Sequence, residues 1–176
     1  MSEHAVVVVE ISQPASQARE RALAVTAWLR ERGVITRNGS RDEVWQPSEY
    51  VAGPRVVEVA PGAHGGANSG VDIVVGRELF HPMENYEPPQ CPRCRAAIDA
   101  DAHHDLIEPW LGGGEPVAAC RACACEELVG DWVGEWTFYV GELAVVFHNW
   151  PPLTDQFVDE LGERLGPRCR MVLKYI

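Results

Sequence analysis

Two matched pairs of cysteines constrain this chain more than any other feature of its sequence. Both are C-x-x-C pairs, at Cys91–Cys94 and Cys120–Cys123, and 25 residues separate them. This arrangement fits a site in which four thiolates hold one Zn²⁺ in a closed tetrahedral shell. Thiolates are soft ligands that suit zinc, and a tight turn lets the two sulfurs of each pair converge. The spacing therefore indicates a metal and a local fold, and it leaves the biological role open.

The segment around these pairs resembles a zinc ribbon, in which two cysteine-bearing turns are joined by an intervening stretch. The resemblance covers Pro89 to Leu128, which is under a quarter of the chain. It implies that a structural zinc is held by four ligands: Cys91, Cys94, Cys120 and Cys123. Alternatives stay open, because Cys125 could replace Cys123, and His103 or His104 could compete as ligands.

A shell of four cysteines favours a structural zinc over a catalytic one. Catalytic zinc sites normally have three protein ligands and keep a fourth position for water. A zinc deaminase would need an H-x-E or C-x-E motif upstream and a proline before the first cysteine. Gln90 occupies that position, and no H-x-E precedes it. A dithiol redox pair would need a C-x-x-C at a helix N-terminus after a strand, and Pro88-Pro89 argue against that setting.

Outside the cysteine segment, the apolar patterns predict a short series of strands and helices. The clearest strands are the runs Ala5–Val9, Val71–Val75, Leu143–Phe147 and Cys169–Tyr175, with weaker strand signals at Val56–Val59 and Trp136–Val140. One helix is expected after Ser12-Gln13-Pro14, with an apolar face formed by Ala18, Ala22, Val25 and Leu29. A second helix is expected after Thr154, which is a good N-cap residue, and it ends at Gly166-Pro167.

The firm elements follow the order β-α-β-β-α-β, which is that of the α+β ferredoxin-like split βαβ fold. In that topology the first and third strands are central, and the second and fourth lie at the edges. Ala5–Val9 and Leu143–Phe147, the two most apolar strands, are the first and the third. We therefore predict a ferredoxin-like core formed by residues 1–88 and 129–176. Residues 89–128 form a zinc ribbon inserted between its second and third strands.

Charge and hydropathy exclude several classes of partner. The net charge is −11, and residues 88–128 carry seven Asp or Glu against three Arg. Nucleic-acid affinity comes mostly from Lys and Arg that neutralise phosphates, so we expect no nucleic-acid binding. No run approaches the roughly 20 apolar residues of a membrane span. The run Ala5–Val9 lacks a basic start and is too short for a signal peptide, so we expect a cytoplasmic protein without membrane contact.

Other features of the sequence favour ordinary structural interpretations. The glycine-rich stretch Gly62–Gly70 lacks the G-K-[ST] ending of a phosphate-binding loop, and we expect a flexible loop. The histidines form no readable nucleophile–base arrangement and are expected at the surface or in packing contacts; they include His64, His81, His103, His104 and His148. The stretch Phe147–Leu153 is similar to bacterial proteins of unknown function that also carry two C-x-x-C knuckles, and this similarity implies no reaction.

These features favour a non-catalytic, zinc-stabilised binding module whose partner is another protein or a second copy of the chain. An edge strand of the sheet offers one route to a homo-oligomer. One alternative is an enzyme with an unrecognised pocket, between the Gly62–Gly70 loop and the ribbon. Another is a zinc or thiol redox sensor that uses Cys125 as a spare thiol.

Overall fold

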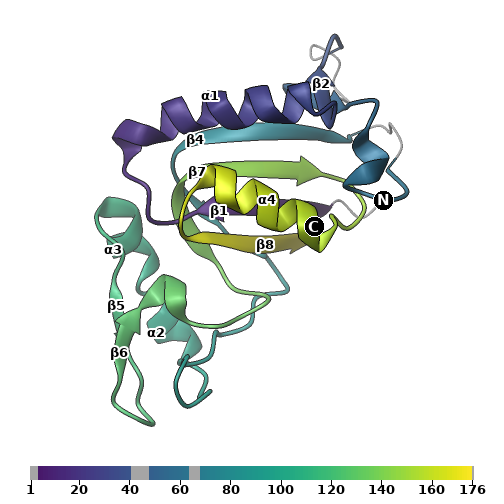
Figure 1. Ribbon diagram of the computed structural model, residues 1–176. Helices are drawn as coiled ribbons and strands as arrows, with labels where there is room; N and C mark the ends of the chain where they lie inside the picture. The colour runs from purple at the N-terminus through teal and green to yellow at the C-terminus, as the bar shows by residue number, and fades with distance from the viewer. Residues whose placement is uncertain (1–3, 41–47, 64–67, 176) are drawn as a thin grey trace.

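A six-stranded sheet forms the centre of the protein, with helices on one face and the cysteine-bearing segment on the other (Figure 1). The computed structural model describes residues 4–40, 48–63 and 68–175. Within these ranges the elements are β1 (His4–Glu10), α1 (Ala15–Glu31), β2 (Ile35–Arg37), β3 (Tyr50–Ala52), η1 (Val56–Glu58), β4 (Gly70–Phe80), α2 (Ala100–His104), α3 (Ile107–Gly112), β5 (Val117–Ala119), β6 (Glu126–Leu128), η2 (Val129–Asp131), β7 (Tyr139–His148), α4 (Asp155–Leu165) and β8 (Cys169–Tyr175).

The strands of the main sheet lie in the order β2-β3-β4-β7-β1-β8, and each neighbouring pair is antiparallel. The predicted α+β class is confirmed, and the two most apolar strands, β1 and β7, are both internal. Six strands are present where four were expected. The prediction that the second strand lies at an edge was wrong, because β3 pairs with β4 at Tyr50 and Val71 and extends the sheet.

Two predicted strand boundaries were wrong for identifiable reasons. Val56–Glu58 forms a 3₁₀ turn instead of a strand. The two runs around Gly141 are one continuous strand, β7. Glycine is needed at that position, because a Cβ atom there would lie 2.5 Å from the carbonyl oxygen of Glu10 on β1. In this strand the glycine permits close approach of two backbones and does not end the strand.

Helices α1 and α4 cover one face of the sheet and build the first of two hydrophobic cores. The predicted apolar face of α1 is confirmed, since Ala18, Ala22, Val25 and Leu29 are all buried. Phe157 and Leu161 of α4 are also buried in this core. Burial of each large aliphatic or aromatic side chain contributes roughly 1.5–3 kcal/mol to stability, so this packing fixes both helices on the sheet.

The start of α1 is held by a buried carboxylate from the preceding strand. The N-cap residue of α1 is Pro14, and no side chain caps the helix. The carboxylate of Glu10, which is fully buried, accepts hydrogen bonds from the backbone N–H groups of Ser12, Gln13 and Arg168. The chain turns from β1 into α1 around this carboxylate, which also joins the start of β8.

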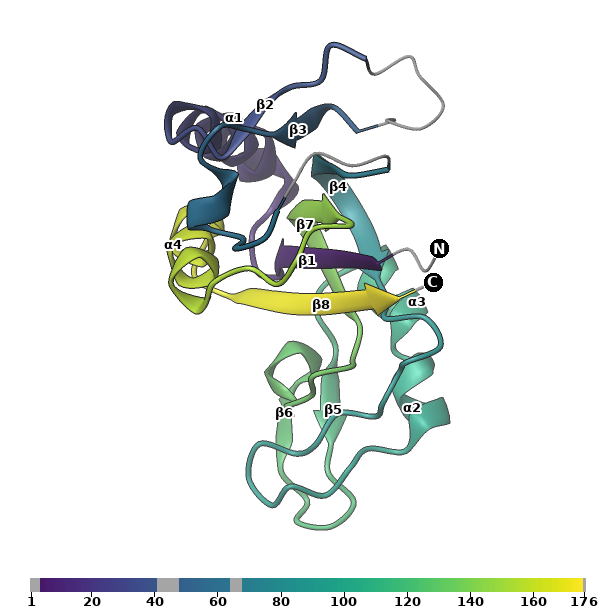
Figure 2. The same cartoon turned by 90° about the vertical axis from the view of Figure 1, so that its right-hand side faces the viewer.

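The opposite face of the sheet is covered by the segment between β4 and β7, which carries α2, α3, β5 and β6 (Figure 2). A second hydrophobic core joins this segment to the sheet. It contains Val7, Val9 and Ala144 from the central strands together with Trp110 and Trp132 from the segment. The buried tryptophans therefore pack the segment against the sheet.

Arginine side chains from the sheet reinforce this contact. Arg168 donates to both carboxylate oxygens of Glu115, at 2.5 and 3.0 Å, and to Asp131 at 2.7 Å. On β4, Arg77 donates to the Trp110 carbonyl at 2.8 Å and forms an ion pair with Glu142. Bidentate guanidinium–carboxylate pairs have a fixed geometry, so they orient the segment as well as attract it.

Candidate metal centre

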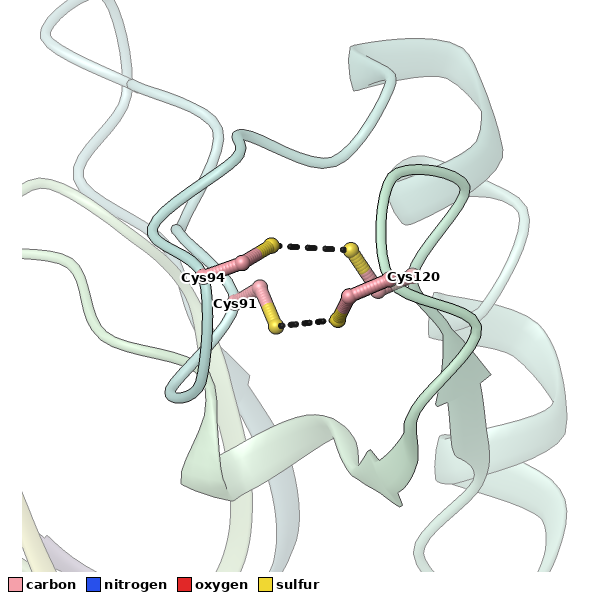
Figure 3. Close-up of side chains that lie close together, drawn as sticks. Cys91, Cys94 and Cys120 are labelled. Carbon is pink, nitrogen blue, oxygen red and sulfur yellow. Dashed lines mark hydrogen bonds between the residues drawn. The ribbon is translucent and has the colours of Figure 1, made fainter.

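The four predicted cysteine ligands lie together in space. The Sγ atoms of Cys91, Cys94, Cys120 and Cys123 are all within 4.8 Å of one another. Among the described residues, these four form the cluster of His, Cys, Asp or Glu side chains that is close enough to hold a metal ion. Cys91 and Cys120 are buried in the second core, whereas Cys94 and Cys123 are exposed. Figure 3 shows the first pair on one turn and Cys120 on a facing turn, with the sulfurs directed into the gap between them. The candidate metal centre therefore extends from the second hydrophobic core to the protein surface.

The two turns have the same backbone structure. In the first, the N–H of Arg95 donates to the Cys91 carbonyl and the Cys91 N–H donates to Ala96. In the second, Ala124 donates to the Cys120 carbonyl, and the Cys120 N–H donates to the carbonyl two positions after Cys123. A strand-like pair encloses each turn, joining Gln90 to Ala97 in the first and Ala119 to Glu126 in the second. The positions correspond one by one, so Cys91 is equivalent to Cys120 and Cys94 is equivalent to Cys123.

This equivalence includes an unusual backbone conformation after each C-x-x-C pair. Arg95 and Ala124 have φ values of 65° and 57°, in the left-handed region. Non-glycine residues adopt this conformation at a cost of about 1 kcal/mol or more. The same strained conformation occurs at both positions, and sequence reasoning missed it because neither residue is glycine.

Two of the sulfur separations are close to those of a tetrahedral zinc site. Zn–S bonds of about 2.3 Å place the sulfurs of a regular tetrahedron about 3.8 Å apart. Cys91 Sγ lies 3.8 Å from Cys123 Sγ, and Cys94 Sγ lies 3.5 Å from Cys120 Sγ. The donor set and its dimensions therefore suit a closed four-thiolate site.

Backbone N–H groups stabilise the thiolate form within the turns. Burial raises the pKa of the Cys91 thiol, but hydrogen bonds from the N–H groups of Cys94 and Arg93 outweigh it and bring the pKa to about 6. The Cys123 pKa is lowered by a hydrogen bond from the Cys125 N–H. These bonds follow from the turn geometry, which directs N–H groups at the sulfurs.

Cys125 contributes a fifth sulfur at the edge of this group. Its Sγ lies 3.2 Å from that of Cys91, and the S–H hydrogen bond it donates there raises the Cys125 pKa to about 12. Cys125 occupies the position that Ala96 occupies in the first turn, where the backbone carbonyl accepts the turn's closing hydrogen bond. The equivalence of the turns therefore favours Cys123 over Cys125 as the ligand.

The two neighbouring histidines lie outside the cysteine cluster. His103 is 1% exposed, stacks on Phe138 with ring centroids 4.0 Å apart, and shares a hydrogen bond of 2.8 Å with the Tyr86 hydroxyl. Burial, helped by His104 and His81, lowers the pKa of His103 to about 4. His103 is thus a neutral packing residue of the segment.

A separate cleft lies on the sheet face beyond the segment. It has a volume of about 680 Å³, a floor that includes Val7 and Val146, and a hydrogen bond of 3.0 Å between His148 and Asp72 on its wall. Burial raises the pKa of Asp72, but hydrogen bonds from His148 and the Glu49 N–H hold it below its ordinary value. This is the kind of acid–base pair that the enzyme alternative requires, and that alternative stays a prediction. Part of the Gly62–Gly70 loop, including His64, lies outside the described residues.

Comparisons with protein-family models, curated proteins and solved structures give no match to this chain. The similarity of Phe147–Leu153 to bacterial proteins therefore stays a prediction. Within the described residues, no helix combines the length and apolar character needed to cross a membrane.

Proposed function

We propose that Cys91, Cys94, Cys120 and Cys123 bind one structural Zn²⁺. The equivalence of the two turns supports this proposal, because each turn presents its two cysteines with the same pattern of backbone hydrogen bonds. A zinc bound here would join the turn after β4 to the turn between β5 and β6. It would thereby fix the fold of a segment that has only short strands and helices of its own.

We also propose that residues 1–88 and 129–176 form a ferredoxin-like core and that residues 89–128 form an inserted zinc ribbon. The order β8-β1-β7-β4 within the main sheet supports this division, since it corresponds to strands 4-1-3-2 of the split βαβ unit. On this interpretation β2 and β3 are an extension at one edge of the sheet. Covering the sheet with the ribbon leaves the helical face and the β8 edge for contacts with other molecules.

The function that these features support best is a non-catalytic, cytoplasmic binding module for a protein partner. Four thiolates leave zinc no open position for a substrate, which supports a structural role for the metal. The chain's net charge of −11 supports a protein partner over a nucleic acid. The zinc would then act indirectly, by holding the ribbon against the sheet.

Metal analysis and affinity capture together test this function. We expect about one equivalent of zinc per chain, and a reproducible protein partner that is recovered by the zinc-loaded protein and lost after chelation. A zinc content below about half an equivalent would overturn the metal assignment. A protein that contains zinc, is monomeric and captures nothing above background would overturn the binding function instead.

The short distance between Cys125 and Cys91 favours a second candidate, a peroxide-sensitive zinc site. The Cys91 thiolate would attack hydrogen peroxide, giving a sulfenic acid and hydroxide. The Cys125 thiol would then attack that sulfur, forming a disulfide and releasing water. Zinc would lose a ligand and dissociate. Peroxide-driven zinc release, followed with a chromophoric chelator, should be reversed by a thiol reductant in the parent protein. Cys125→Ser should abolish the disulfide, and unchanged reversible release in that variant would refute this role.

A further inference from the structure

Strand β8 presents an unpaired edge on the side away from β1. It lies at one end of the main sheet (Figure 2). Among the described residues, its outer side makes one isolated bridge, between Tyr175 and Met83. The stretch Arg170–Lys174 therefore has no second strand partner in the described structure. Such an edge can accept an added strand through its free N–H and C=O groups.

A trough runs between this strand and helix α4. It consists of two adjoining cavities of about 430 and 700 Å³, which share Val158, Asp159 and Met171. We call it the β8–α4 trough. Leu173 adds to its apolar floor, and Met171 is 42% exposed. Trp150 lines one end, and its buried indole N–H has no hydrogen-bond partner among the described residues.

Three carboxylates form one wall of the trough. Asp155, Asp159 and Glu163 follow one another at intervals of four residues along α4, and all three are exposed. No ion pair to them occurs in the described part of the chain. Arg21 and Arg170 line the far cavity, so the acidic character is strongest in the half near Trp150. A cationic occupant would be attracted to that half.

The spacing of these carboxylates matches that of alternate residues on a strand. Residues four apart on a helix are about 6 Å apart along its axis. Alternate residues of a strand, which point to the same face, are about 6.7 Å apart. Residues of helix α4 and of β8 line both cavities of the trough together, so the two elements are neighbours. An added strand with Lys or Arg at every second position could therefore place one cation opposite each of Asp155 and Asp159, with its methylene stem over Met171.

We propose that the β8–α4 trough binds an extended segment of a partner protein with Lys or Arg at alternate positions, as an additional strand on β8. This inference rests on the proposed binding function and specifies the chemistry of the partner. Backbone pairing with β8 would supply affinity, and the carboxylates of α4 would supply selectivity for cations.

The probe is a fluorescein-labelled (Lys-Thr)₃ peptide, and its binding to the zinc-loaded protein is followed by fluorescence anisotropy. We expect saturable binding that is lost with (Glu-Thr)₃. A peptide N-methylated on the edge that faces β8 should bind at least tenfold more weakly, because it cannot pair with the strand. The combined variant Asp155→Asn, Asp159→Asn, Glu163→Gln should weaken binding about tenfold, since each exposed ion pair contributes only a modest attraction.

A charge-matched control separates the trough from general attraction to an acidic protein. The variant Glu20→Gln, Asp101→Asn, Glu108→Gln removes the same charge at exposed positions elsewhere and should change binding less than twofold. Equal losses in both variants would overturn the proposal, as would full affinity of the N-methylated peptide or no binding by folded, zinc-loaded protein. A concentration-dependent dimer that competes with the peptide would assign the edge to a second copy of the chain and overturn it too.

Failure of the trough proposal can be distinguished from failure of the proposed binding function. If the trough variant keeps its zinc and still captures the partner of the parent protein, the binding module stands and the trough proposal is refuted. If the parent protein binds the peptide and captures no partner, the trough stands and the wider function is the part that fails.

Discussion

Replacing His103 with phenylalanine should remove a large part of the protein's sensitivity to mild acid. The buried His103 ring, stacked on Phe138, has a pKa of about 4 against an ordinary value of 6.5. The folded state therefore keeps this ring neutral at a pH where the unfolded chain protonates it. Stability from this difference is fully present above pH 6.5 and is lost as the pH falls toward 4.

The size of this stability loss follows from the width of the pH range in which only the unfolded chain is protonated. Each pH unit in which only the unfolded state is protonated costs about 1.4 kcal/mol of stability. Between pH 7.5 and 5.0 the window spans about 1.5 units, which gives about 2 kcal/mol. We therefore expect His103→Phe to lose about 1–2 kcal/mol less stability than the parent protein over this range. Stopping at pH 5.0 limits acid-driven loss of zinc.

Urea unfolding of zinc-loaded protein at several pH values measures this difference directly. The stability of the parent should fall more steeply than that of His103→Phe as the pH falls. His104→Gln is the matched control, because that ring is exposed and adds only a secondary repulsion to His103. Parallel parent and His103→Phe curves, or an NMR titration that places the His103 pKa above 6, would refute the reasoning.

Five other substitutions test three separate parts of the structure. Cys123→Ser should lose most of its zinc and Cys125→Ser should keep it, as measured by metal analysis; the opposite result would exchange their roles. Ala124→Gly should stabilise the zinc-loaded protein by about 0.5–1 kcal/mol by relieving the left-handed backbone, whereas Ala122→Gly in the same turn should not. Thermal unfolding distinguishes the two. Glu10→Gln should destabilise by about 2 kcal/mol, because an amide cannot accept all the buried N–H groups; an unchanged urea midpoint would contradict this.

The features that could be predicted from the sequence depend on local spacing or on long apolar runs. The cysteine cluster was predictable because each C-x-x-C pair forms a turn by itself, and a four-cysteine site requires only that two such turns meet. The central positions of β1 and β7 were predictable because strands covered on both faces are apolar throughout. Both signals are contained in short stretches of chain.

The features that were missed depend on partners distant in the sequence. Strands β2 and β3 have three residues each, too few to show a pattern, and they form only by pairing with each other and with β4. In the sequence Glu10 is only the polar residue at the end of an apolar run. Its role was missed because one of its hydrogen-bond donors, Arg168, lies 158 positions away. The β8–α4 trough likewise requires α4 and β8 to lie side by side, which no local pattern indicates.

The position of the ribbon between β4 and β7 also affects the order of folding. Pairing of these strands, which begins at Phe80 and Tyr139, must close a loop of roughly 60 residues. Zinc held by both turns would shorten that loop by about 25 residues, which lowers the closure cost by only about 0.5 kcal/mol. Refolding of the sheet in stopped-flow experiments should therefore slow only about twofold in zinc-free buffer. The sheet can therefore form first, and a zinc bound by both turns would act later, when the segment between β4 and β7 packs onto a sheet that already exists.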